Sequence, residues 1–470
     1  MILGSFIVFL LSFIAVGVFS STKSKKTSSD YLLASHSEKP WKIALAAVAT
    51  NNSGYMFIGM IGYAYTNGIS AFWIMICALI GDFCASLFIH QKFRVFAGKS
   101  HSLSFSELIS KWGGNDYKTL RVISALIVAI FLTVYAAAQF KAGGKAMEAV
   151  FGSQFVIGVI LGGLAVLIYS SFGGIRASIW INTLQSFIMI TSMALIFFAG
   201  LYEIGGFSKF FLAINQVSPD FCDIFPDKLI FNQGFGLLFF LIGWFFGGFG
   251  IIGQPHIMTS FMALDKPESV KKIRIYYYGW YLFFFALTIG TGLIARVLIP
   301  FDGIFDPELA LPTLAKNLLP EFLIGFILAG LFSATLSTAD SQILSSSAAI
   351  TNDLLPKKRN SYAIVKANTA IIAFFATSLA LFDNQSVFSL VMIAWLALAC
   401  SFSPLIIVYA LGGKISQKMA LIMMFFGFTS MMIWRHFNLG DAVYEAAPGI
   451  ICGLIPYLVY KFFKKTAKLF

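Results

Sequence analysis

The chain has 470 residues, of which 58% are hydrophobic and only 11% are charged, and its net charge is +12. Soluble domains are about half apolar and about one-quarter charged, so this composition excludes an ordinary water-soluble fold. The basic residues are spread along the chain rather than gathered in a separate domain, which argues against nucleic-acid binding.

Runs of about 20 apolar residues, the length that crosses ~30 Å of hydrocarbon as a helix, recur along the whole chain. We therefore predict an all-α membrane protein in which residues 1–470 form a single membrane transport domain. The predicted spans, thirteen in all, are 2–20, 41–64, 70–92, 120–145, 154–173, 178–202, 232–259, 275–300, 320–351, 363–382, 386–410, 417–435 and 444–462.

The basic residues also predict the orientation of these spans, because Lys and Arg collect in short cytoplasmic loops. With the N-terminus outside, 26 of the 33 lysines and arginines fall in segments predicted to be cytoplasmic. Span 2–20 has no positive residues before it and is predicted to be an uncleaved anchor. The sequence thus predicts a multi-pass protein of the inner (plasma) membrane, with the N-terminus outside and the C-terminus cytoplasmic.

Two of the predicted spans contain sequence that forms helices poorly. Residues 49–54 read Ala-Thr-Asn-Asn-Ser-Gly, and residues 247–255 read Gly-Gly-Phe-Gly-Ile-Ile-Gly-Gln-Pro. Transporters often bind solute and ion where two such broken helices meet near the bilayer midplane. The breaks are five spans apart, and because five is odd, the two sets of five spans cross the membrane in opposite senses.

This spacing predicts a five-plus-five inverted repeat in which helices 2 and 7 are broken. The first repeat would comprise residues 41–202 and the second residues 232–410. Residues 2–20 would then be an extra N-terminal helix, and residues 417–462 two C-terminal helices.

Span 320–351 combines many hydroxyls with one carboxylate, and residues 334–342 read Ala-Thr-Leu-Ser-Thr-Ala-Asp-Ser-Gln. Sodium can be held by a few neutral hydroxyl and carbonyl oxygens, and a broken helix supplies free carbonyls. The alternative is that these side chains only bond back to their own helix or hold helices together. The residues alone leave both interpretations open.

Three motifs resemble signatures of the sodium/solute symporter family: residues 49–54, Gly-Gln-Pro-His at 253–256, and Ser-Thr-Ala-Asp-Ser-Gln at 337–342. The similarity spans almost the whole chain, and Gly-Gln-Pro-His together with Tyr135 resembles the sodium/proline symporter branch. The resemblance implies thirteen spans and a leucine-transporter-like fold. It also implies a main sodium site made of the carbonyls of Ala49, Asn52 and Ala334 and the hydroxyls of Ser337 and Thr338.

Two positions depart from the family pattern. Asn51 stands where the proline branch has an aspartate, and Asn182 stands where many members have another. Asp340 lies one turn from Ser337 and could restore a carboxylate, either as a sodium partner or as a proton carrier; the alternative is a neutral Asp340 bonded to Asn182 or Gln185. The candidate second cation or proton site therefore comprises Asp340, Ser341 and Asn182.

Solute contacts are expected beside the first break. In the proline branch an aromatic pair in the second broken helix contributes to binding, whereas Gly247 and Ile251 stand at those positions here, which suggests a wider pocket and a solute other than proline. Ordinary core packing is the alternative for any single aromatic residue. The predicted substrate residues are Ser53, Tyr55, Met56, Trp73, Tyr135, Gln139, Gly247, Ile251 and Gln254.

The resemblance implies a secondary active transporter, not an enzyme, that imports a small organic solute such as an amino acid in symport with sodium by alternating access. Sodium is the expected co-transported ion, with no organic cofactor and no catalytic residue. The expected partners are the solute, sodium and the lipid bilayer, without an obligatory protein partner. One alternative is a proton-coupled symporter that uses Asp340. The other is a membrane solute sensor without transport, and the lack of a signalling module in the sequence argues against it.

Overall fold

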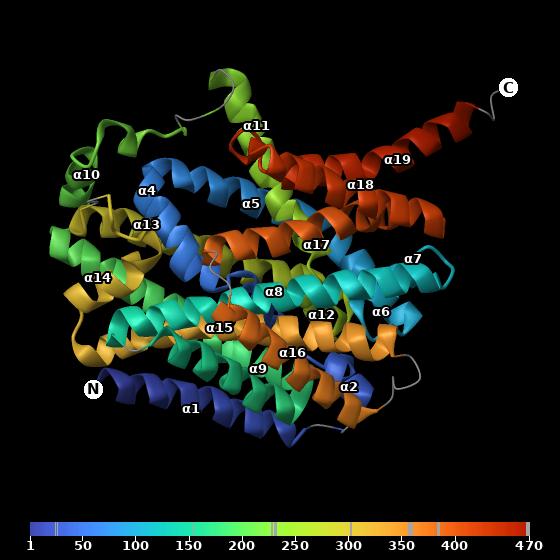
Figure 1. Ribbon diagram of the computed structural model, residues 1–470, viewed down its shortest axis with the longest axis horizontal. Coiled ribbons are helices and arrows are strands. Elements are labelled where there is room, and N and C mark those ends of the chain that lie inside the picture. Colours follow the sequence, from blue (N-terminus) through green and yellow to red (C-terminus); the bar gives the residue numbers. More distant parts are fainter. Residues whose placement is uncertain are drawn as a thin grey trace.

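The computed structural model describes residues 1–23, 25, 27–152, 154–226, 229, 233–300, 303–355, 361–382 and 386–466. These residues are nearly all helical, and their single isolated β-bridge joins Glu38 to Leu264. Several long helices run side by side across the molecule (Figure 1). The predicted all-α class is confirmed. Some basic residues that entered the orientation prediction lie outside the described residues, namely Lys26, Lys228, Lys357, Lys358, Arg359 and Lys468.

The longer helices follow the predicted spans in chain order. They are α1 (Ile2–Ser21), α5 (Ala71–Ala85), α8 (Lys118–Phe151), α9 (Phe155–Ile204), α11 (Gln233–Phe249), α13 (Val270–Leu298), α15 (Glu321–Ala348), α16 (Tyr362–Phe382), α17 (Val387–Ala410), α18 (Gln417–His436) and α19 (Ala446–Thr466). Shorter helices lie between them: α2 (Ser28–Leu33), α6 (Gln91–Ser100), α7 (Phe105–Trp112), α10 (Phe207–Asn215) and α14 (Ala310–Leu318).

The first interrupted span consists of α3 (Pro40–Asn51) and α4 (Ile61–Asn67). Pro40 suits the first position of α3, because the N–H that proline lacks would have no partner there. The helix ends at Asn51, and Asn52 has φ −90° and ψ 69°, outside the helical region. Helical structure resumes after Ser53 and passes through a π-helical turn at Met56–Met60. The first predicted break is therefore present.

The second interrupted span consists of α11 and α12 (Pro255–Met262). Residues Gly250–Gly253 form a 3₁₀ turn, and Gln254 is extended, with φ −96° and ψ 101°. A residue before proline is disfavoured in the α conformation, so Pro255 both ends the first half and begins the second. The second predicted break is also present.

A sharp bend at Gly174 divides α9, which has 50 residues and covers two of the predicted spans. Gly174 has φ 56° and ψ −140°, and a Cβ at this position would lie 2.2 Å from the backbone oxygen of Tyr31. Both the backbone conformation and the close approach therefore require glycine.

Eleven helical segments in the described chain are long and apolar enough to cross a membrane. Predicted span 41–64 is divided by its break, and within span 154–173 the apolar helix is only Phe155–Ile168, shorter than the roughly 20 residues needed to cross alone. The count of thirteen therefore stays a prediction, as do the repeat boundaries 41–202 and 232–410.

The helices differ in how deeply they are buried. In Figure 1, α1 lies along one edge, α18 and α19 lie along the opposite edge, and α8 and α15 lie between them. Within its most apolar stretch, 83% of α15 is buried, against 22% for α1. A helix buried on every side can carry polar residues only if they face protein or a cavity, which makes α15 the natural place for a site.

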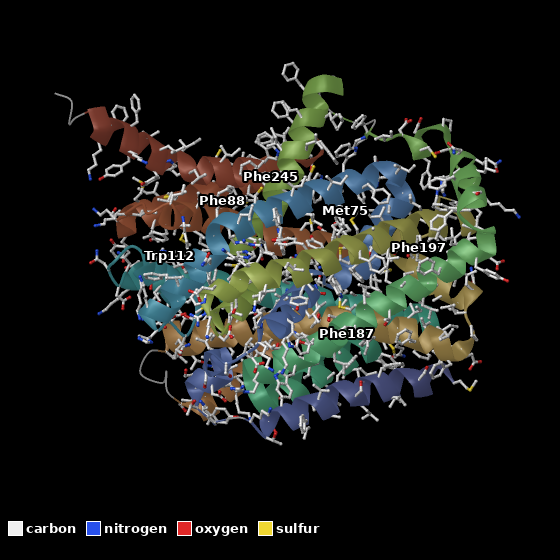
Figure 2. All side chains as sticks on the ribbon, turned by 180° about the vertical axis from the view of Figure 1, so that it is seen from behind. Met75, Phe88, Trp112, Phe187, Phe197 and Phe245 are labelled. Atoms are coloured by element: carbon white, nitrogen blue, oxygen red, sulfur yellow. The ribbon has the colours of Figure 1, made fainter. Side chains whose placement is uncertain are left out.

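Large apolar side chains cover the outer helices. Figure 2 shows side chains projecting on all sides of the molecule, including Phe88 and Phe187, which are 61% and 50% exposed. Apolar exposure on this scale is unusual for a soluble monomer and suits contact with lipid. The chain is thus a multi-pass membrane protein.

Arg176 organises a buried ion cluster just after the bend in α9. Its guanidinium lies 2.7 Å from Asp30 Oδ1 and 3.1 Å from Glu38 Oε1, and it donates to the carbonyl of Ala34 at 2.9 Å. Burial raises the pKa of Asp30, but hydrogen bonds from the Lys25 N–H, the Ser35 hydroxyl and Arg176 outweigh this effect and lower that pKa. The cluster therefore joins the segment before the first broken helix to α9.

Replacing Arg176 by Met should lower the free energy of unfolding by about 3–5 kcal/mol, because two buried carboxylates lose their cation. The check is thermal unfolding of the purified protein in detergent. The control is Glu321→Gln, which removes an ion pair to the N-terminus in which Glu321 is 61% exposed and should change little. Equal midpoints for the two variants would contradict this role. Because the pKa of Asp30 is lowered on folding, the ionised Asp30 stabilises the folded protein at neutral pH, and this stabilisation is lost as pH falls through the lowered pKa.

Candidate functional site

The hydroxyl-rich middle of α15 lies against the end of α3, where the first break begins. The Ser337 hydroxyl donates to the carbonyl of Ala49 at 3.2 Å or to that of Ala334 at 3.0 Å. The Thr338 hydroxyl donates to the carbonyl of Thr50 at 2.9 Å or to that of Ala334 at 3.1 Å. These five residues are all buried.

The oxygens of this cluster outnumber its protons. Two hydroxyls supply one proton each, whereas three carbonyls and the two hydroxyl oxygens offer lone pairs. Such a group of neutral oxygens, held away from water, suits a small hard cation. The arrangement can therefore bind a cation without a carboxylate.

Four of the five predicted sodium ligands come together in this cluster: Ala49, Ala334, Ser337 and Thr338. Asn52 lies beyond them at the end of α3, where its backbone N–H and its side-chain amide both donate to the carbonyl of Val48, at 3.0 and 2.8 Å. The carbonyl of Thr50 was not predicted. It takes part because the neighbouring carbonyls of Ala49 and Thr50 lie opposite the neighbouring hydroxyls of Ser337 and Thr338.

Asn182 on α9 connects the same region to Ser341. Its amide nitrogen lies 3.3 Å from the Thr50 hydroxyl, 3.2 Å from the Ser341 hydroxyl and 3.3 Å from the carbonyl of Ser337. In the described part of the chain, its amide oxygen has no hydrogen-bond partner. Asn182 and Ser341 therefore lie directly beside the first cluster, and the amide oxygen of Asn182 remains an unused acceptor among the described residues.

Asp340 is completely buried on α15, and neither of its carboxylate oxygens has a hydrogen-bond partner among the described residues. Ser178 on α9 is its polar neighbour, and the Ser178 hydroxyl accepts from the Asn182 amide at 3.3 Å. The side-chain amide of Gln185 is likewise without a partner in the described chain. The expected hydrogen bond from Asp340 to Asn182 or Gln185 is thus not formed. A carboxylate in these surroundings needs a proton if it is neutral and a cation if it is ionised.

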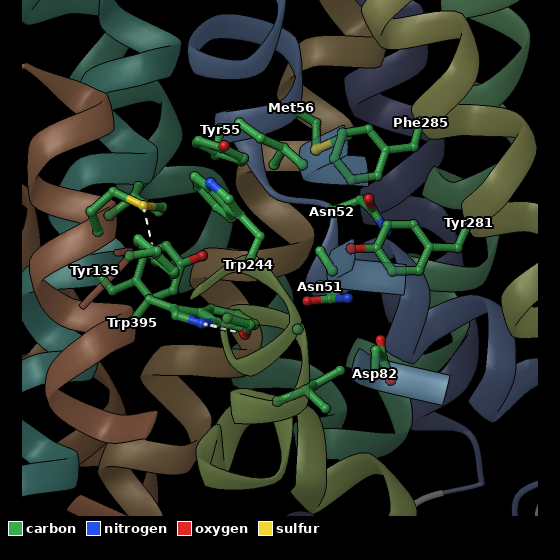
Figure 3. Close-up of a pocket in the computed structure, with 18 residues that line it drawn as sticks. Asn51, Asn52, Tyr55, Met56, Asp82, Tyr135, Trp244, Tyr281, Phe285 and Trp395 are labelled. Atoms are coloured by element: carbon green, nitrogen blue, oxygen red, sulfur yellow. Dashed lines mark hydrogen bonds between the residues drawn. The ribbon is translucent and has the colours of Figure 1, made fainter. Parts of the chain in front are cut away.

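Beside the first break lies a cavity of about 80 Å³ (Figure 3). It is walled by the two broken spans together with α5, α8, α13 and α17 and by the segment before α19. The residues that line it are Asn51, Asn52, Tyr55, Met56, Ile74, Ala78, Asp82, Tyr135, Trp244, Gly247, Gly248, Ile251, Tyr281, Phe285, Val391, Met392, Trp395 and Tyr444.

Five of the nine predicted substrate residues line this cavity: Tyr55, Met56, Tyr135, Gly247 and Ile251. The other four do not. Gln139 accepts the backbone N–H of Gly54 at 2.9 Å, Ser53 accepts that of Tyr55 at 3.2 Å, and the Gln254 amide donates to the carbonyl of Trp395 at 2.9 Å. Trp73 stacks on Phe225 with ring centroids 5.5 Å apart. Gln139 and Ser53 thus support the broken backbone, and Gln254 connects the second break to α17.

Several lining residues were missed in the sequence, among them Tyr281, Phe285 and Trp395. Tyr277, Tyr281 and Phe285 are spaced four residues apart and therefore share one face of α13, which is a signal that the sequence does carry. Nothing in the sequence shows that this face meets the breaks. Only the packing of α13 beside α3 and α5 brings it there.

Tyr444 occupies the space that was expected to widen the pocket at Gly247. Its ring stacks on Trp244 with centroids 4.2 Å apart, and a Cβ at Gly247 would lie 2.7 Å from its Cε1. The Tyr444 hydroxyl also donates to the sulfur of Met392 at 3.3 Å. An aromatic wall is thus present at this position, but the segment before α19 supplies it.

A second, larger cavity adjoins the first and shares Trp244, Met392 and Tyr444 with it. Its other lining residues come from helices and from the segments between them, and include Asn67, Ser218, Asp220, Arg435 and Glu445. The first cavity therefore lies below a broader vestibule, and the Trp244–Tyr444 stack stands between them.

The sodium:solute symporter family model matches residues 31–427. The sodium/proline symporter of Escherichia coli (strain K12) is 28% identical to this chain, over 98% of this chain and 93% of its own length. The osmoregulated proline transporter OpuE of Bacillus subtilis (strain 168) is 26% identical, over 97% of this chain and 94% of its own. These relatives are transporters, not enzymes.

Among solved structures, a Na⁺-coupled sialic acid symporter in a substrate-bound outward-open state matches with a TM-score of 0.79 at 18% identity, over 97% of both chains. This likeness shows a shared fold, and the predicted leucine-transporter-like fold is confirmed. Because the family match covers most of its length, the chain belongs to the sodium:solute symporter family.

Proposed function

We propose that this protein imports a small organic solute, such as an amino acid or a related compound, in symport with sodium by alternating access. One observation carries the proposal: the hydroxyls of Ser337 and Thr338 meet the carbonyls of Ala49 and Thr50 at the first break. The relatives named as proline transporters and the Na⁺-coupled sialic acid symporter support the same coupling.

Sodium would bind among the oxygens of Ala49, Asn52, Ala334, Ser337 and Thr338. A bound ion takes up the carbonyl lone pairs for which the two hydroxyls have too few protons. In doing so it holds α3 against α15 and sets the position of the break beside the solute cavity. Solute and ion would therefore stabilise the same arrangement, which is the basis of their coupling.

The vestibule supports a direction of transport. Its walls include Asn67, Asp220 and Arg435, which lie in segments that the distribution of basic residues assigns to the outside. With the N-terminus outside and the C-terminus in the cytoplasm, the cavity would receive solute from the outer side. The Trp244–Tyr444 stack would then have to move before solute enters.

Asp340, Asn182 and Ser341 support a second cation site next to the first. The carboxylate of Asp340 and the amide oxygen of Asn182 are both buried acceptors without a partner in the described chain. A second sodium ion would supply the missing positive charge. A proton carried by Asp340 is the second candidate, and the same unpartnered carboxylate favours it.

No organic cofactor and no protein partner enter this mechanism, and the chain acts on solute and ion within the bilayer. The alternative hypothesis from another functional class is a membrane protein that senses a solute without transporting it. Sodium-driven accumulation of a solute in proteoliposomes separates transport from sensing.

Changing Ser337 and Thr338 together to Ala should raise the sodium concentration for half-maximal uptake by about tenfold or more. Two ligand oxygens are lost, and a hydrogen bond or ligand of this kind is worth about 1 kcal/mol or more. Uptake in proteoliposomes with an imposed sodium gradient measures the change. Ser333→Ala is the matched control, because in the described part of the chain the Ser333 hydroxyl bonds within α15, to the carbonyl of Ala329 at 2.7 Å. An unchanged sodium dependence in the double variant, with correct insertion, would refute the site.

Changing Asp340 to Asn should weaken the dependence of uptake on sodium if the carboxylate faces a second sodium ion. Sodium titrations at fixed pH, repeated with a proton gradient alone, distinguish the two ions. Proton-driven uptake that Asp340→Asn abolishes would favour the proton-coupled alternative. A sodium dependence equal to that of the wild type would reject an ionic role of Asp340 in sodium coupling.

A further inference from the structure

Asp82 on α5 is the one charged side chain among the residues that line the solute cavity, and no lysine or arginine is found in that lining. The residue is only 1% exposed. Among the described residues, Asp82 has no ion-pair partner. On the same side of the molecule, Arg274 donates to the hydroxyl and the carbonyl of Ser86, one turn further along the chain, at 3.0 and 2.7 Å.

The hydrogen bonds of Asp82 suit an ionised carboxylate. The hydroxyl of Tyr277 donates to Oδ2 at 3.0 Å, and that of Tyr278 donates to Oδ1 at 2.7 Å. Both oxygens thus accept a hydrogen bond from a neighbouring hydroxyl, as the oxygens of an ionised carboxylate do. The amide of Asn51 donates in turn to the Tyr277 hydroxyl at 2.7 Å, so the carboxylate is connected to the end of α3.

Close backbone packing sets Asp82 beside the second break. A Cβ at Gly81 would lie 2.0 Å from the carbonyl oxygen of Phe245, and one at Gly248 would lie 1.9 Å from that of Ala78. Helices α5 and α11 therefore touch at their backbones at Ala78 and Gly81, within the turn that precedes Asp82. Asp82 is held at the junction of the two broken spans, below Asn51 and Tyr281 in the view of Figure 3.

The rest of the lining is largely aromatic. Seven rings line the same cavity, contributed by Tyr55, Tyr135, Trp244, Tyr281, Phe285, Trp395 and Tyr444. Aromatic faces attract organic cations, whereas an alkali-metal ion needs several oxygen ligands. At Asp82 the neighbouring oxygens are two tyrosine hydroxyls whose protons already point at the carboxylate. The surroundings therefore suit an alkylated ammonium better than sodium.

We propose that the transported solute carries a positively charged nitrogen, an amine or a quaternary ammonium, which pairs with Asp82 while its hydrocarbon part lies against the aromatic rings. The inference rests on the proposed transport function and names the solute class for that cavity. A buried carboxylate without a cation is costly, and the solute removes that cost when it binds. A zwitterion fits as well, with its carboxylate toward Asn51 and Asn52, but a purely anionic solute meets only repulsion.

Two pairs of probes test the charge with the shape held constant. Choline is compared with its uncharged isostere 3,3-dimethylbutan-1-ol, and proline with tetrahydrofuran-2-carboxylate, which has oxygen in place of the ring nitrogen. Binding is measured by thermal shift of the purified full chain in saturating sodium chloride. In at least one pair the member with the charged nitrogen should bind about 30-fold or more tightly. Equal binding of the two members in both pairs, or no stabilisation by either charged member, overturns the proposal.

Two variants test whether the Asp82 carboxylate causes any preference for the charged member of a pair. Asp82→Asn keeps the shape but removes the charge, and should abolish the preference for the charged member. Tyr278→Phe removes one hydrogen bond to Asp82 but keeps its charge, and should retain that preference. A preference that persists in Asp82→Asn overturns the proposal.

The same measurements separate this inference from the proposed function. Stabilisation of Asp82→Asn by sodium chloride alone, relative to potassium chloride, shows that the variant is folded and that its ion site is intact. If that sodium effect survives while the charge preference is lost, Asp82 acts on the solute. If Asp82→Asn instead loses the sodium effect and keeps the charge preference, Asp82 serves the ion and the solute class proposed here is wrong. Loss of sodium-driven uptake in the Ser337 and Thr338 variant concerns the transport function alone.

Discussion

The architecture depends on one constraint: backbone groups released where two helices break must find partners inside the protein, because the bilayer offers none. At the first break, Gln139 accepts the N–H of Gly54, and the hydroxyls of Ser337 and Thr338 meet the carbonyls of Ala49 and Thr50. At the second break, the Trp395 indole donates to the carbonyl of Gly247 and the Ser403 hydroxyl donates to that of Gly250. Polar residues in otherwise apolar helices are thus explained by the backbone that they satisfy, and the oxygens left over form the candidate ion site.

Some buried carboxylates are paired with a basic side chain and others are not, and this difference separates structural from functional groups. Around Arg176 the carboxylates of Asp30 and Glu38 are paired at short distances, so this cluster is complete without a ligand. Asp82 and Asp340 are equally buried, but neither has a basic partner among the described residues. Because an uncompensated buried charge is costly, these two positions are where a transported cation or a proton would be stabilised.

The C-terminal helices contribute more than lipid contact. The segment between α18 and α19 places Tyr444 over the cavity, where it stacks on Trp244 and fills the space beside Gly247. Two glycines of α11 allow this approach, since a Cβ at Gly243 would lie 2.5 Å from the backbone nitrogen of Tyr444. The cavity wall is therefore shared between the broken span and a helix pair outside the predicted repeat.

Much of the fold is determined by the sequence itself. Apolar length determines that helices cross the membrane, and residues 49–54 and 247–255 determine where two of them break, because glycine, asparagine and the residue before proline all disfavour helix. The hydroxyls at Ser337 and Thr338 were also visible, since polar residues in a buried span require a partner. These features are local, and local chemistry is what a single sequence displays.

The tertiary structure alone decided which distant residues share the cavity. Tyr281 was visible only as one of many aromatic residues, and Tyr444 lies almost 200 residues from the Gly247 that it covers. Gln139 and Gln254 looked like solute contacts but bond to backbone groups of the first break and of α17, and among the described residues Asp340 forms no hydrogen bond with Asn182. Which residues become such neighbours depends on how each helix is rotated and on how side chains far apart in the sequence pack together, and no local sequence pattern records this. The oxygens of the ion site could therefore be predicted better than the walls of the solute cavity.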